Sequence, residues 1–309
     1  MKIRNVISNI NPFNNKQEMP TTLYVIKKML AFLVIQISAA VIGEVLIIGA
    51  LTVMGYNPTS GDMPGGHFAE LSQYFGFAIF IIIALLYCKF IEKTNLKTIG
   101  FNKKVYDFLP GGFIALILLT VIATIACVTG SLSLNNINSN IDVIYLIALF
   151  FGFIIQSFAE EIICRGFLLT SLSKKVSLPL AVFVSSTAFA LPHLPSLLDA
   201  DTVFVVIGLL NIYLVSTVFS LLFVLRSNIF IIGGLHSIWN FVLYGVMGLT
   251  VSGGNGSTNG IINFVVNSGN IFNGGIYGLE ASIITTVTLG ITVIILVKLL
   301  KNRRVKNGL

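Results

Sequence analysis

Eight apolar runs of about 20 residues constrain the fold of this chain more than any other feature of its sequence. An α-helix of that length crosses the hydrocarbon core of a bilayer. The sequence therefore predicts an all-α, polytopic membrane protein with about eight transmembrane helices. The expected spans are 30–54, 72–92, 110–130, 143–172, 178–197, 203–225, 228–249 and 281–300.

Composition supports the same fold class. Only 10% of the residues are charged and 55% are apolar, with a mean hydropathy of +0.93. A soluble domain carries about 25% charged residues. The net charge of +7 is spread over several short loops, which indicates contact with anionic lipid head groups rather than nucleic acid.

The positions of lysine and arginine predict the orientation. All 19 basic residues lie on one side of the expected membrane or in a span close to that side, and the alternate loops contain none. These alternate loops are 55–71, 131–142, 198–202 and 250–280. By the positive-inside rule, an even number of spans with both termini in the cytoplasm satisfies every one of these positions. The expected location is thus the cell membrane.

The chain divides into five expected regions. The polar motifs considered next all lie in the fourth to seventh spans, which makes that segment the expected functional core. The loop that follows is rich in glycine and asparagine and is expected to be mobile. The regions are a cytoplasmic tail (1–29), the first three spans (30–142), the core (143–249), the external loop (250–280), and the last span with a basic cytoplasmic tail (281–309).

Ionisable residues inside spans are costly, at about 2.5–3.5 kcal/mol each, and usually face a bundle interior or a wet cavity. Counting from the cytoplasmic turns puts Glu160 and His193 ~20–27 Å along their helices and His236 ~15 Å along its own. Three spans therefore bring polar groups to roughly one layer. Glu44 is isolated in the first span and no role is assigned to it. The full set is Glu44, Glu160, Glu161, Arg165, His193, His236 and Asn240.

Helical spacing sorts these residues into roles. Glu161 and Arg165 are four residues apart, so they can form an ion pair on one face of the fourth span. Glu160 is left without a local counter-charge, and an unpaired carboxylate near two histidines suits a general base acting on water. His236 and Asn240 are also four residues apart, and the asparagine amide is a suitable oxyanion donor.

Three short polar motifs occur in order, each on a separate expected helix: Glu160-Glu161-x-x-x-Arg165, Phe189-x-x-x-His193 and His236-x-x-x-Asn240. Each pattern alone is weak, but together they resemble the motifs of the CPBP (Abi, CAAX-protease-like) family of intramembrane endopeptidases. The resemblance covers about residues 143–245. It implies an all-helical membrane protease whose site opens toward the cytoplasm and the inner leaflet.

The resemblance also implies roles. In such enzymes Glu160 and His193 would activate the attacking water, and His236 and Asn240 would stabilise the transition state. The implied supporting residues are Glu161, Arg165 and Phe189, the last packing beneath His193.

The name of the family describes its members as metalloproteases. One glutamate with two histidines is an acceptable zinc ligand set. Glu160, His193 and His236 would then hold the ion. The same groups can also activate water directly, and the sequence leaves both mechanisms open.

The expected partner is a peptide or protein substrate at the membrane, prenylated or bacteriocin-like, and its identity cannot be read from the sequence. One alternative is a non-catalytic bacteriocin-immunity or scaffold protein of the same fold. Another is a secondary transporter whose charges line an ion path. The clustering of the charges in one layer, without an evident inverted repeat, disfavours the transporter.

Overall fold

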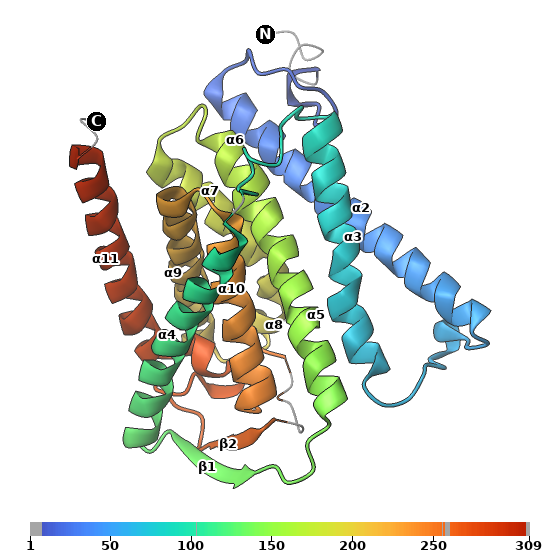
Figure 1. Ribbon diagram of the computed structural model, residues 1–309, viewed down its shortest axis with the longest axis vertical. Coiled ribbons are helices and arrows are strands. Elements are labelled where there is room, and N and C mark those ends of the chain that lie inside the picture. The colour runs from blue at the N-terminus through green and yellow to red at the C-terminus, as the bar shows by residue number, and fades with distance from the viewer. Residues whose placement is uncertain (1–7, 103, 255, 257–259, 307–309) are drawn as a thin grey trace.

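The computed structural model describes residues 8–102, 104–254, 256 and 260–306, and within this part the chain is a bundle of membrane-length helices (Figure 1). Eight helical segments in the described residues are long and apolar enough to cross a bilayer, which confirms the expected fold class. These segments are Thr21–Val53, Phe68–Phe90, Val105–Val128, Val143–Leu172, Leu178–Leu198, Thr202–Arg226, Ile229–Val246 and Ile283–Arg303.

The regular elements follow the spans closely. Two of the membrane segments change to π-helical winding, at Ile162–Leu169 and at Val242–Val246. The helices are α2 (Thr21–Val53), α3 (Phe68–Phe90), α4 (Phe108–Val128), α5 (Val143–Glu161), α6 (Thr170–Leu172), α7 (Leu178–Ala190), α8 (Leu194–Leu198), α9 (Thr202–Arg226), α10 (Ile229–Phe241) and α11 (Ile283–Lys306), and the strands are β1 (Leu132–Ile137) and β2 (Ile262–Val266).

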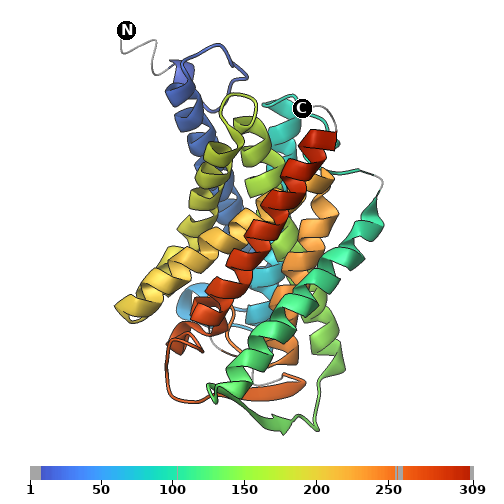
Figure 2. The same cartoon turned by 90° about the vertical axis from the view of Figure 1, so that its left-hand side faces the viewer.

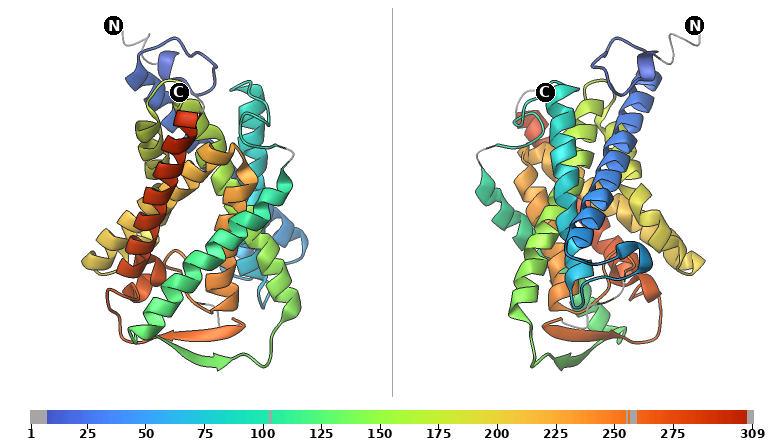
Figure 3. Two further views of the ribbon diagram at one scale, coloured as in Figure 1. Left: turned by 60° about the vertical axis from the view of Figure 1, so that its left-hand side comes forward. Right: turned by 90° about the vertical axis from the view of Figure 1, so that its right-hand side faces the viewer.

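The bundle has two distinct ends. α2 begins and α11 finishes at one end, as an even number of spans requires, and the two strands lie at the other end (Figure 1). α5, α7, α9 and α10 form the centre. α2 and α3 lie along one side, and α4 and α11 lie along the other, as the turned views show (Figures 2 and 3).

The first span begins earlier than predicted. α2 starts at Thr21, inside the stretch expected to be a cytoplasmic tail up to residue 29. Lys28 is buried there, with its Nζ 2.6 Å from both carboxylate oxygens of Glu92 at the end of α3. A buried counter-charge lets a lysine lie within a helix instead of marking its flank. The ion pair fastens α2 to the bundle.

The glycine- and asparagine-rich segment expected to be a mobile loop instead contains a strand and two short turns. β2 pairs antiparallel with β1, with Leu132 opposite Val266. Asn273 is fully buried, and its side-chain amide donates to the carbonyl oxygen of Ser131. Hydrogen bonds between distant parts of the chain, invisible to local composition, give this segment its structure.

Glycine allows α4 and α10 to touch backbone to backbone. A Cβ on Gly111 of α4 would lie 2.0 Å from the carbonyl oxygen of Ile231, and one on Gly234 of α10 would lie 2.1 Å from that of Phe108. Small residues at such crossings are how membrane helices approach closely. This contact fixes the position of α10, which carries His236 and Asn240.

Gly111→Ala is therefore expected to lower the melting temperature and the folded yield, because the added methyl group would force α4 and α10 apart. Overpacking of this kind costs about 1–3 kcal/mol. Thermal unfolding followed by size-exclusion chromatography in detergent would measure it. Gly43→Ala in α2 is the matched control, because no atom lies within 4 Å of a Cβ there. Equal melting temperatures for the two variants would contradict the close contact.

Candidate active site

The two glutamates of the motifs, Glu160 and Glu161, lie where the helical winding changes. α5 ends at Glu161, and the chain continues as the π-helical segment Ile162–Leu169. The second π-helical segment, Val242–Val246, begins two residues after Asn240. Single π-helical turns are rare and concentrate at functional sites, because they re-aim the side chains beside them.

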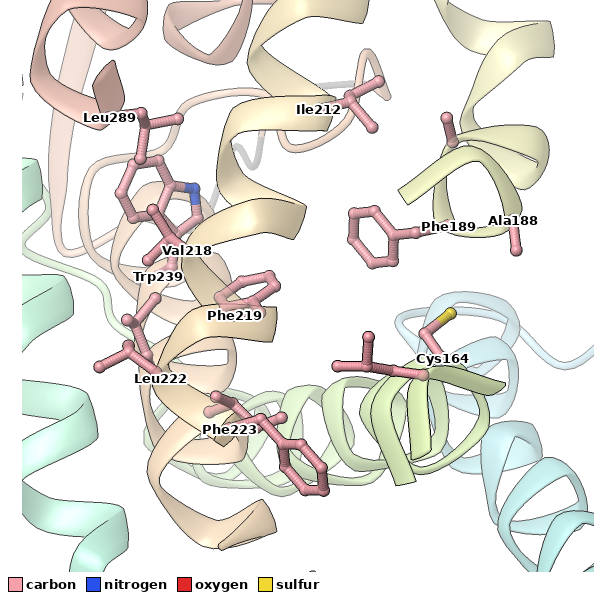
Figure 4. Packing of buried hydrophobic residues seen from close by; sticks show 14 of the residues in the cluster. Cys164, Ala188, Phe189, Ile212, Val218, Phe219, Leu222, Phe223, Trp239 and Leu289 are labelled. Carbon is pink, nitrogen blue, oxygen red and sulfur yellow. The ribbon is translucent and has the colours of Figure 1, made fainter. Parts of the chain in front are cut away.

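Glu161 and Arg165 form the ion pair that their spacing predicted. Arg165 Nη1 lies 2.9 Å from Glu161 Oε1, and both side chains are fully buried. The other guanidinium nitrogen, Nη2, donates to Ser216 Oγ on α9 at 2.5 Å. The guanidinium also lies against the rings of Phe189 and Phe219, which face each other in the core (Figure 4). The pair therefore joins α5, α7 and α9.

His236 is oriented by the same carboxylate. Its Nδ1 lies 3.0 Å from Glu161 Oε1, and its ring stacks on Phe219 with centroids 5.0 Å apart. A carboxylate accepts hydrogen bonds, so Nδ1 carries the proton and Nε2 is directed elsewhere. That Nε2 lies 3.8 Å from Glu160 Oε2.

Glu160 is held on one side and open on the other. Gln156 Nε2 donates to Glu160 Oε1 at 2.6 Å, and Gln156 Oε1 accepts from Asn240 Nδ2 at 3.0 Å. Glu160 Oε2 is buried and has no hydrogen-bond partner. The 3.8 Å gap to His236 is too long for a direct hydrogen bond. An oxygen atom about 2.8 Å from both groups would give this carboxylate oxygen a partner.

His193 stands apart from the two glutamates. It ends the 3₁₀ turn Leu191–His193 that follows α7, and its Nδ1 lies 2.9 Å from the carbonyl oxygen of Phe189. Because a carbonyl only accepts, Nδ1 is the donor, and Nε2 is then an acceptor in the neutral ring. Within the described residues, no hydrogen bond or ion pair joins His193 to Glu160 or Glu161. Phe189 packs against His193 as predicted, with ring centroids 4.9 Å apart.

A cavity of about 40 Å³ brings three of the four predicted catalytic residues together: His193, His236 and Asn240 all line it. A cavity needs only about 10–15 Å³ to hold a water molecule, so this one accepts water but is too small for a peptide. The rest of the wall comes from Phe189 of α7, Trp239 of α10, α9, α11 and the segment between α10 and α11. Glu160 is not among the lining residues; it borders the site through His236.

Residues from the segment after α10 complete this wall and were missed by sequence reasoning. Glu280 Oε1 accepts from Trp239 Nε1 at 2.9 Å, and Glu280 Oε2 accepts from the backbone N–H of Ser252 at 2.5 Å. The carboxylate thus ties the external segment to α10, next to Asn240. Glu280 is the only acidic residue after Asp201 in the sequence, and that isolation is the signal that could have marked it.

The zinc site that the resemblance implies is not assembled. Glu160 Oε2 and His236 Nε2 face each other, as two metal ligands would. However, no group of three His, Cys, Asp or Glu side chains that could hold a metal ion occurs in the part of the chain that the structure describes. His193 is the missing third ligand, so the residues as arranged do not fit a zinc ion.

Arg165→Met is expected to lower stability by about 3–5 kcal/mol, because it leaves the buried Glu161 carboxylate without its cation. Glu161→Gln should also destabilise the fold. The double variant should lose less than the sum of the two, because both single changes break one interaction. Thermal unfolding in lipid nanodiscs gives the three values. Strictly additive losses would mean that the two side chains do not stabilise each other.

Comparison with known proteins gives one family. Residues 142–242 match the family model described as type II CAAX prenyl endopeptidase Rce1-like. The matched segment holds all three motifs and runs from the start of α5 to the end of α10, leaving out α2, α3, α4 and α11. A search of curated proteins finds no match for the chain.

Proposed function

Because residues 142–242 belong to the CAAX-protease-like (CPBP) family, as their motifs predicted, we propose that this multi-pass membrane protein is an intramembrane endopeptidase. It hydrolyses a peptide bond of a membrane-associated peptide with water activated by Glu160. The observation that carries the proposal is the buried, unpartnered Glu160 Oε2 facing His236 Nε2 at 3.8 Å beside a water-sized cavity. The family is one of proteases, which favours hydrolysis over ion transport.

Glu160 is the general base. Its Oε1 is fixed by Gln156, so Oε2 is the oxygen that takes a proton from water. The resulting hydroxide attacks the carbonyl carbon of the substrate, and a new C–O bond forms. When the C–N bond breaks, the proton held on Glu160 passes to the leaving amine nitrogen. General acid–base transfer of this kind contributes about 10²–10⁴-fold to the rate.

The two histidines differ in what they can offer. His193 donates through Nδ1 to the Phe189 carbonyl, so in its neutral form Nε2 accepts a hydrogen bond from the attacking water. His236 donates through Nδ1 to Glu161. A doubly protonated His236 ring would donate through its Nε2–H to the oxyanion. Hydrogen bonding thus supports the roles that the family resemblance implies.

Asn240 adds a second donor for the oxyanion. One N–H of its amide is used by Gln156 Oε1, and the other is free to point into the cavity that Asn240 lines. A positioned amide donor stabilises the charge that develops on the carbonyl oxygen. Gln156 links this donor to Glu160, so one side chain positions both the general base and the oxyanion donor.

Glu160→Gln is expected to reduce cleavage at least ~10²-fold, because the amide has nearly the same shape but cannot take a proton. Membrane insertion and melting temperature should stay unchanged. Cleavage of a peptide library by protein in proteoliposomes, analysed by mass spectrometry, gives the readout. Glu44→Gln is the matched control, because Glu44 lies exposed on α2. Full activity of the Glu160 variant would return the chain to the non-catalytic immunity or scaffold class.

Chelation tests the metal separately. Since the described side chains form no group of three ligands, protein treated with a chelator is expected to keep its cleavage rate with far less than one metal ion per chain by elemental analysis. A metal-dependent enzyme would instead lose activity and regain it on addition of Zn²⁺. That result would mean that His193 moves to join Glu160 and His236.

A further inference from the structure

A second hollow, the α7–α9–α11 groove, lies where α9 contacts both α7 and α11. It is lined from 178 to 186 on α7, from 213 to 221 on α9 and from 297 to 301 on α11. Its volume is about 410 Å³, within the range of ~300–1,000 Å³ that is typical of ligand pockets. Among the described residues, it shares no lining side chain with the cavity of the candidate active site. The groove is therefore a separate candidate site.

The walls of the groove suit a hydrocarbon chain better than a polar molecule. Most of the lining side chains are apolar, among them Val182 and Leu221. The hydroxyl of Tyr213 bonds to Thr187 Oγ1 at 2.9 Å, and Thr217 Oγ1 donates to the carbonyl oxygen of Tyr213 at 2.7 Å. These hydroxyls are thus used inside the protein. An apolar chain in the groove would be held by van der Waals packing, the main attraction between apolar groups within a bilayer.

The length of the groove matches one leaflet of the membrane. Its lining residues extend from Leu178 to Ser186 on α7 and from Tyr213 to Leu221 on α9, which is ~12 Å along each helix. Half of the hydrocarbon core of a bilayer is ~15 Å thick. A groove of this length suits a single lipid chain. It is too short to hold a helix of another protein that crosses the whole bilayer.

The basic residues indicate which leaflet this is. α7 begins just after Lys174 and Lys175, and α9 finishes at Arg226. The groove lies along the parts of α7 and α9 that are next to these basic residues. The positive-inside rule therefore predicts that it faces the cytoplasmic leaflet.

A cation stands where the groove meets the head groups. Lys301 is exposed, and among the described lining residues it is the one charged side chain. It lies near the end of α11, which finishes at Lys306. Close by, Arg303 Nη1 donates to the carbonyl oxygen of Leu225 and so holds the end of α11 beside α9. A lysine at the end of a membrane helix extends its ammonium group to the level of the head groups, where it attracts anionic lipids.

We propose that the α7–α9–α11 groove is a binding site for an anionic phospholipid of the cytoplasmic leaflet. One acyl chain lies in the groove, and the phosphate group pairs with Lys301. The apolar walls, the length of one leaflet and the charge at the rim all fit this occupant. The proposal does not rest on the proposed peptidase function, because it concerns a separate hollow.

Tryptophan fluorescence tests the site without using activity. Trp239 is the only tryptophan in the sequence, so Trp239→Phe gives a background in which Phe183→Trp places a single tryptophan in the groove. The protein is reconstituted into equimolar phosphatidylglycerol and phosphatidylcholine. In one sample only phosphatidylglycerol carries brominated acyl chains, and in the other only phosphatidylcholine does. Bromine quenches tryptophan on contact, so the two samples report which lipid occupies the groove.

The groove is expected to favour phosphatidylglycerol about fivefold, the factor that one lysine supplies near a membrane surface. In the same background, Lys301→Ala should bring this preference close to one. Lys298→Ala is the matched control, because it removes the same charge from the same helix at an exposed residue that does not line the groove. Equal quenching by the two lipids before Lys301 is changed would overturn the proposal. Equal losses from Lys301→Ala and Lys298→Ala would also overturn it.

Two further variants separate a bound lipid from the lipid that surrounds any membrane protein. Ile294→Trp, in place of Phe183→Trp, puts the tryptophan on the exposed surface of α11 outside the groove, where no preference is expected. The same preference there would mean boundary lipid only. Ser186 is buried in the groove wall and its Oγ has no hydrogen-bond partner, so Ser186→Leu fills the groove without breaking a bond. It should weaken quenching by both lipids, and unchanged quenching would mean that the chain lies outside the groove. Quenching of the Ile294→Trp variant alone would mean that another molecule, such as a prenylated peptide or a second copy, covers the groove, which would overturn the proposal.

Discussion

The site depends on one buried carboxylate oxygen. Glu161 Oε1 accepts from Arg165 and from His236 at once, and through Arg165 it reaches Ser216 on α9. A carboxylate in this position is tolerable only because a cation and a hydrogen-bond donor both face it. The same two contacts lock α5, α9 and α10 together and turn His236 so that its Nε2 points at Glu160. The atoms that stabilise the packing of these helices therefore also orient the histidine of the proposed site.

The neighbouring glutamate has the opposite environment because adjacent residues on a helix point about 100° apart. Glu161 turns toward Arg165 in the packed interior. Glu160 turns toward Gln156 and His236, where one of its oxygens has no partner. A single residue step thus separates a structural carboxylate from the proposed base, and the change to π-helical winding follows directly after the pair.

Much of this could be predicted from the sequence, and the limits have a physical cause. The spans follow from run length, and the Glu161–Arg165 pair follows from helical spacing, so both predictions are confirmed. Ser216 and Glu280 were missed because each acts on a residue of another element. Gln156 is four residues from Glu160 on the same helix, but its bond to Asn240 of α10 cannot be predicted from spacing. The early start of α2 was also missed because its cause is a distant contact: the counter-charge of Lys28 is Glu92, just after α3.

The sequence by itself determined the eight membrane helices, the intrahelical ion pair and the order of motifs in the segment that matches the family model, because hydropathy and helical periodicity are local properties of the chain. Only the tertiary structure decided that His236 forms the close contact with Glu160, and that residues of the segment between α10 and α11 help to line the cavity. Those distances are set by how closely helices pack, as at Gly111 and Gly234. Helical periodicity determines on which face of its helix a residue lies, but not which residues of other helices contact that face.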